Sequence, residues 1–176
     1  MDKAVKALWV TANFFLLLAY ICAWYQIELS VLFNKKSAVA LHLAIAGPSM
    51  LLHFFASLGV LFYFIGTGTW MKDQAHSVRG RSHDKAQKIW DIYERCNRLK
   101  GWAFPFPTFC IFLGILTFVI GAAIDIGAVP HWVHPTLATA LTTLGILGSP
   151  FIFWAMKRNV EGLDQISNML DQSHNG

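Results

Sequence analysis

The chain has 176 residues, of which 55% are hydrophobic and 14% charged, and its formal net charge is +4 at neutral pH. A soluble domain carries about 25% charged residues because its surface must be solvated, so this composition excludes an ordinary soluble domain and favours an integral membrane protein. The positive charge does not indicate a nucleic-acid-binding protein, because the basic residues flank apolar segments and so act as determinants of topology.

Four apolar segments are long enough to cross a bilayer, which takes about 20 helical residues. We predict transmembrane helices at residues 7–25, 38–65, 102–124 and 133–156, all within one membrane domain that spans residues 1–176. Aromatic rings with a polar group prefer the interface between lipid and water. Seven such residues fall near the predicted span ends: Trp9, Trp24, Tyr25, Trp70, Trp102, Trp132 and Trp154. The predicted fold class is therefore an all-α bundle of four transmembrane helices.

The distribution of Lys and Arg sets the orientation of this bundle. If the N-terminus is inside, twelve of the fourteen basic residues lie in cytoplasmic segments, and eight of them fall in the loop at 72–100. Only Lys35 and Lys36 then lie outside. Cytoplasmic loops carry the excess of Lys and Arg, so both termini and the long loop are expected on the cytoplasmic side of a bacterial cytoplasmic membrane.

Two polar segments next to spans three and four show helical spacing of apolar residues. Residues 82–100 and 157–171 are expected to extend these spans into the cytoplasm as a helical hairpin. Gly66-Thr67-Gly68, at the end of span two, is interpreted as a flexible helix stop. The two apolar stripes would pack on each other, or dock a partner protein: Ile89, Ile92, Tyr93, Cys96 and Leu99 on one segment, and Val160, Leu163, Ile166 and Leu170 on the other.

Histidines at membrane depth are the most informative feature, because ionisable groups are costly in lipid and indicate function. His42 and His53 lie eleven residues apart, about three turns, and so share one face of span two. This face continues with small residues, among them Ala46 and Ser49. Span four repeats the design, with His134 at its outer end followed by small residues at helical spacing: Ala138, Thr142, Gly145, Gly148 and Ser149.

Two helices with small faces and facing imidazoles can hold a planar macrocycle between them. We therefore predict a membrane electron-transfer subunit that binds one b-type haem near the outer face, with His42 and His134 as ligands of the haem iron. Ala46, Ser49, Ala138 and Gly145 are expected to line the cofactor. In architecture the pattern resembles the small b-type cytochrome anchors of respiratory enzymes, and this resemblance implies other membrane subunits or a quinone as partners.

Two alternatives and a possible second site stay open. Small faces also pack membrane helices closely without any cofactor, and the chain would then be a non-catalytic accessory subunit of a larger complex. A copper or zinc ion could instead use His42, His134, His131 and Asp125 at the outer rim. Finally, His53 lies about 16 Å deeper than His42 and has no partner histidine at its level, so with Thr142 and Ser149 it is a candidate second polar site, for example for a quinone.

Overall fold

The computed structural model of the chain describes residues 2–32, 35–125 and 128–171, and this part contains five α-helices and no strand. The helices are α1 (Asp2–Leu32), α2 (Lys35–Arg79), α3 (His83–Ala103), α4 (Pro105–Asp125) and α5 (Val133–Asp171). Four helical stretches are long and apolar enough to cross a membrane: Asp2–Trp24, Ala40–Arg79, His83–Gly121 and Val133–Asp171. The predicted all-helical class with four candidate spans is thus confirmed.

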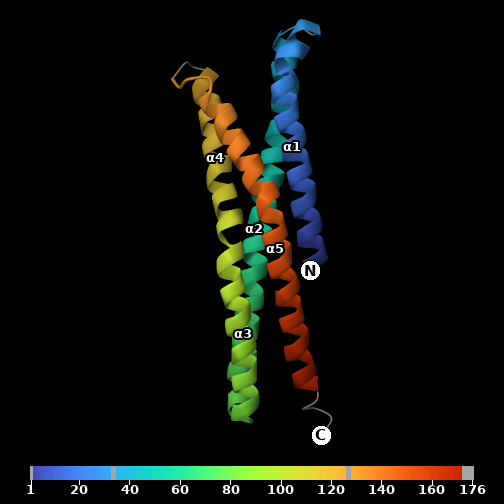
Figure 1. Ribbon diagram of the computed structural model, residues 1–176, viewed down its shortest axis with the longest axis vertical. Helices are drawn as coiled ribbons and strands as arrows, with labels where there is room; N and C mark the ends of the chain where they lie inside the picture. Colours follow the sequence, from blue (N-terminus) through green and yellow to red (C-terminus); the bar gives the residue numbers. More distant parts are fainter. Residues whose placement is uncertain (1, 33–34, 126–127, 172–176) are drawn as a thin grey trace.

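The helices form an elongated bundle in which α1, α3 and α4 run in one direction and α2 and α5 run in the other (Figure 1). α1 packs along α2, and α4 packs along α5, while α3 and α4 follow each other along nearly one line. α1 ends and α2 begins at one end of the bundle, where α4 also ends and α5 begins; this end is named here the outer end after the predicted orientation. The turn between α2 and α3 lies at the other, inner end, toward which α5 also runs.

α2 is much longer than the sequence predicts. It has 45 residues, roughly 68 Å at 1.5 Å per residue, against a hydrocarbon core of roughly 30 Å, so it must project far beyond any bilayer that it crosses. Gly66 and Gly68 lie inside this helix, so their interpretation as a helix stop is wrong. The physical reason is packing: Thr67 and Gly68 are buried under α3 and α5, and tertiary contacts outweigh the low helix propensity of glycine.

Local sequence explains where α3 begins and ends. The Ser82 side chain caps its N-terminus by accepting a hydrogen bond from the backbone N–H of Lys85 at 3.4 Å. At the other end Pro105 and Pro107 provide no backbone N–H groups, which interrupts the helix around Phe104. The N–H of Phe104 still bonds to the Lys100 carbonyl at 2.8 Å, so α4 continues close to the line of α3.

Two apolar clusters hold the described helices together. One lies in the bundle and includes Trp9, Val60, Phe64 and Met156. Trp9 is therefore not an interfacial residue as predicted, since its exposed fraction is 0%. The second cluster lies toward the inner end and joins three helices, because α2 contributes residues to the contact that the sequence predicts for α3 and α5 alone: Met71 and Ala75 from α2, Ile89, Ile92 and Cys96 from α3, and Ile166 from α5.

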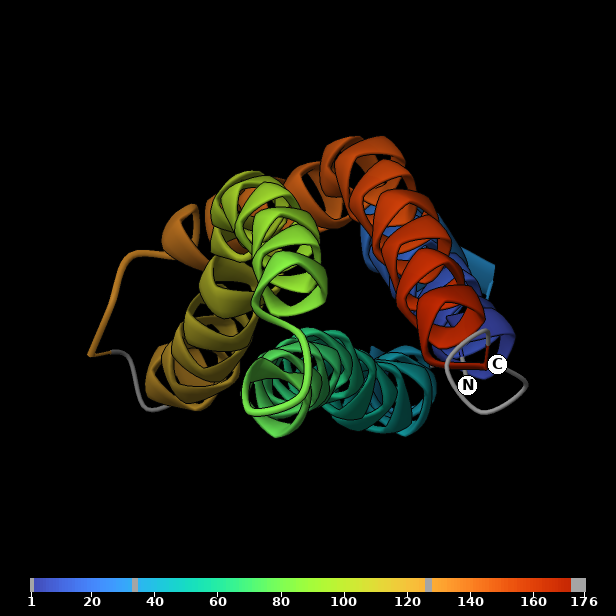
Figure 2. The same cartoon turned by 90° about the horizontal axis from the view of Figure 1, so that it is seen from below.

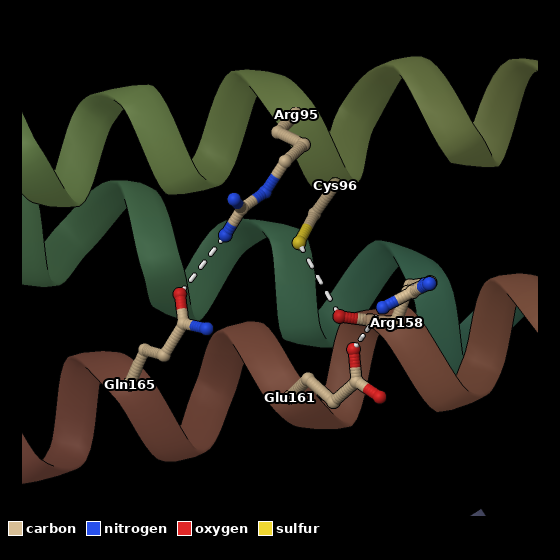
Figure 3. A network of polar contacts seen from close by, with 5 residues as sticks. All are labelled: Arg95, Cys96, Arg158, Glu161 and Gln165. Carbon is tan, nitrogen blue, oxygen red and sulfur yellow. Dashed lines mark hydrogen bonds and ion pairs between the residues drawn. The ribbon is translucent and has the colours of Figure 1, made fainter.

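Polar contacts flank this inner cluster where α3 lies along α5 (Figure 3). The Arg95 guanidinium donates to the Gln165 side chain at 2.9 Å, and the Cys96 thiol lies 3.9 Å from the Arg158 carbonyl. Seen from the inner end, α2, α3 and the end of α5 surround a common axis (Figure 2). The inner extension is therefore a three-helix unit, in which α2 is the member that sequence analysis did not anticipate.

Candidate functional site

The two outer histidines, His42 of α2 and His134 of α5, lie within electrostatic range of each other. In sequence they are 92 residues apart. His134 turns toward α4, where its Nδ1 lies 3.1 Å from the Thr117 carbonyl oxygen. Its ring lies on Gly121, where an added Cβ would come within 3.1 Å of the His134 Cε1. Glycine at 121 thus makes the room in which this imidazole lies.

The bond to Thr117 determines the form of the His134 ring. A carbonyl oxygen only accepts, so the bond requires the proton on Nδ1 and leaves the lone pair on Nε2. Histidines that bind metals commonly donate their other ring N–H to a carbonyl in this way, which fixes the tautomer and the ring orientation. His42 differs, because its Nδ1 is buried without a hydrogen-bond partner among the described residues.

The small residues expected to line a cofactor fall into two groups. Ala46 and Ala138, one turn inward of the two outer histidines, are only partly buried. Deeper in the bundle the small face of α5 is already filled: a Cβ at Gly145 would meet Asn13 and His53, and one at Gly148 would meet the Phe106 ring. The small residues that stay partly uncovered are therefore those at the outer level.

The hydroxyl groups on these faces bond to their own helices. Ser49 donates to the Ile45 carbonyl at 2.6 Å, and Thr142 donates to the Ala138 carbonyl at 2.9 Å. Ser149 donates to the Gly145 carbonyl at 2.8 Å and accepts from the Trp9 indole N–H at 2.9 Å. None of these hydroxyls bonds to His53 in the described part of the chain.

His53 is the centre of a second, deeper polar cluster. It is 1% exposed and packs against the Trp9 ring, with 5.4 Å between the ring centroids. Asn13 of α1 reaches the same place, since its side chain and the His53 ring both contact Gly145. The Asn13 amide donates to the Trp9 carbonyl at 2.9 Å. Four buried polar atoms of this cluster have no hydrogen-bond partner among the described residues: Asn13 Oδ1, His53 Nδ1, His53 Nε2 and Ser57 Oγ.

Sequence analysis missed the part that α1 plays in this deeper cluster. Asn13 is an amide within an otherwise apolar segment, and amides at that depth usually bond across helices, so a signal was present. Trp9 gave no such signal, because its position near the start of α1 suits an interfacial ring equally well. Only the packing of α1 against α2 and α5 brings both residues to His53.

The outer-rim residues proposed for a copper or zinc ion do not form a ligand group in the part of the chain that the structure describes. His131 is exposed in the turn before α5, and the side chain of Asp125 lies outside the described residues. Among the side chains that are described, no group of three or more His, Cys, Asp or Glu is placed to hold a metal ion.

Comparison of the chain with protein-family models, with curated proteins and with solved structures gives no match.

Proposed function

We propose that the chain is a membrane electron-transfer subunit that binds one b-type haem between α2 and α5 near the outer end, with His42 and His134 as axial ligands. The observation that carries this proposal is the bond from His134 Nδ1 to the Thr117 carbonyl, which leaves Nε2 free to bind a metal, beside a second imidazole within electrostatic range. A bound haem would supply a site that takes up and releases one electron.

The burial of polar atoms supports a ligand at this level. An unpaired buried polar group costs about 1–3 kcal/mol, and the His42 Nδ1 is such a group among the described residues. Gly121 admits the His134 ring, and the small side chains of Ala46 and Ala138, one turn inward of the histidines, would let a planar group approach α2 and α5. The fit is confined to this outer level, because Asn13 and His53 fill the face at Gly145.

The proposed orientation places the outer end, with its histidines, away from the cytoplasm. α1 begins and α5 ends on the side of the α2–α3 turn, and the excess of Lys and Arg belongs to the same side. Both termini and the three-helix inner extension would then be cytoplasmic, in a bacterial cytoplasmic membrane. The extension is the part that would contact other subunits of a complex.

A quinone, or another redox subunit, is the proposed electron-transfer partner. An apolar groove of about 270 Å³ between α1 and α2 supports the quinone, and its lining includes Phe15, Ala44 and Ser49. Pro48 lies in this groove and has no N–H, so the Ala44 carbonyl lacks its usual helical donor and is free to accept a bond from a quinol hydroxyl. Ala44 is two residues from His42 along α2, so the groove lies at a depth similar to that of the proposed haem but on another face of the helix.

The visible absorption spectrum of the purified protein tests the proposal. A Soret band and a sharp α band after reduction are expected, and His42→Ala or His134→Ala should each abolish or strongly alter them. His131→Ala is the matched control, since this exposed histidine lies in the turn beside His134 and should leave the spectrum unchanged. Bound copper or zinc without a Soret band would favour the metal site, and the absence of both would favour an accessory subunit.

A further inference from the structure

A buried polar cluster at the inner end of the bundle has no part in the proposed haem site. Asn159 of α5 is 0% exposed and joins α5 to α2, because its amide donates to the Thr67 hydroxyl at 2.9 Å and to the Tyr63 hydroxyl at 3.3 Å. The Asn159 Oδ1 is buried without a partner among the described residues. Polar capacity therefore remains unused where α2, α3 and α5 meet.

Lys100 of α3 adds a cation to this place. It is 5% exposed, and its ammonium group rests on Gly68 of α2, where even a single added Cβ would collide with the Nζ atom. Cys96, one turn earlier on α3, is within electrostatic range of both Lys100 and Tyr63, so the three helices share one cluster. Gly68 thus forms a cradle for the lysine.

No carboxylate balances this charge in the described part of the chain. The ion pairs there are Lys6–Asp2, Lys88–Asp84 and Arg158–Glu161, and none of them involves Lys100. Lysine is almost never fully buried unless it is paired, because moving an ammonium out of water without a counter-charge is very costly. An anion beside the ammonium group would offset this cost, and the described residues provide none.

The level of Lys100 in the bundle indicates where that anion comes from. Trp70, Trp102 and Trp154, on α2, α3 and α5, are all exposed close to this cluster in sequence. Exposed tryptophans at one level on several helices are typical of the headgroup region of a bilayer, where lipid phosphates lie. Among the described residues no acidic side chain pairs with Lys100, so none there would bind a headgroup cation, which favours a lipid of net negative charge.

We propose that Lys100, cradled on Gly68, binds the phosphate of an anionic phospholipid at the cytoplasmic interface. This inference rests on the membrane orientation given under the proposed function, and it is independent of the haem. The lipid would link the bundle to the three-helix inner extension, because Lys100 lies at the junction of α3 and α4 and touches α2.

Thermal unfolding of the detergent-purified full chain tests the proposal, once native mass spectrometry shows that no lipid remains bound. Short-chain phosphatidylglycerol, about a hundredfold above its dissociation constant, should raise the Tm by about 5–10 °C. Phosphatidylcholine with the same chains should have a much smaller effect, and glycerol 3-phosphate should have none. Because no haem is needed, a preparation without a Soret band gives the same answer.

Lys100→Met is the decisive variant and Lys157→Met its matched control, since Lys157 is exposed on α5 and carries the same charge. Lys100→Met should unfold at the wild-type Tm or above it without lipid, because an unpaired charge has been removed, and should not respond to phosphatidylglycerol. Lys157→Met should respond like the wild type. An equal response of Lys100→Met and wild type, or no response of the wild type, would overturn the proposal. An equal effect of glycerol 3-phosphate would replace the lipid by a soluble phosphate.

Discussion

Gly145→Ala probes the deeper polar cluster, because side chains of α1 and α2 lie directly against Gly145 of α5. A Cβ at this position would overlap the Asn13 Oδ1 and come within 3.3 Å of the Asn13 Cγ and the His53 Cε1. Neither neighbour can move freely: the Asn13 amide is held by the Trp9 carbonyl at 2.9 Å, and His53 packs on the Trp9 ring.

The expected size of the effect follows from three contributions. Overpacking of a closely packed interior costs about 1–3 kcal/mol. Displacing Asn13 would lose its hydrogen bond to Trp9, worth about 0.5–1.5 kcal/mol. Replacing glycine by alanine within a helix returns about 1 kcal/mol. The net expectation is a loss of about 1–3 kcal/mol, or a fall in Tm of about 2–12 °C for a chain of this length.

Circular dichroism during heating in detergent measures the effect, and Gly66→Ala is the matched control. Gly66 also lies inside a helix, but none of the described atoms is within 4 Å of its added Cβ, so this variant should keep or gain stability. Asn13→Ala combined with Gly145→Ala should recover much of the loss, since it removes the obstructing side chain. Full wild-type stability of Gly145→Ala would refute the close approach of the three helices.

Three further predictions concern separate parts of the molecule. His53→Leu should leave the free energy of unfolding unchanged or raise it by up to about 3 kcal/mol, because it removes two buried nitrogens that lack described partners. A clear loss of stability in the same thermal assay would show that a ligand or water bonds to these nitrogens. Gly162→Leu should cost about 2–3 kcal/mol and increase proteolysis of the inner extension, because its side chain would displace Cys96 and Ile92, and unchanged protection would argue against this packing. In sealed cells, with the native cysteines replaced, an impermeant maleimide should label Val129→Cys but not Ser77→Cys, and the reverse pattern would invert the orientation.

The sequence predicted the number and approximate place of the candidate spans because hydropathy acts over whole segments. Four long apolar stretches are enough to expect four helices, whatever their individual contacts. The end of α2 was not predictable in the same way. Thr67 and Gly68 have low intrinsic helix propensity, and the helix continues through them because α3 and α5 cover this part of it.

The candidate site was predictable at the level of residue type and period, but not at the level of contacts. Helical spacing alone puts His42 and His53 on one face, and the opposed direction of neighbouring spans puts His134 near the level of His42. Helical spacing does not reveal that Asn13 and His53 fill the face at Gly145, or that the Thr117 carbonyl accepts a hydrogen bond from the His134 ring. These contacts depend on how α1 and α4 rotate about their axes, which small-residue patterns do not fix.

The most direct measurement of the central claim is low-temperature electron paramagnetic resonance of the oxidised, purified protein. Two imidazoles on a ferric haem give a low-spin signal, and we expect this signal in the wild type and in His131→Ala. His42→Ala and His134→Ala should each convert any remaining haem to a high-spin form, because each removes one axial ligand. A low-spin signal that persists in both variants, or a wild-type protein that binds no haem, would contradict the account.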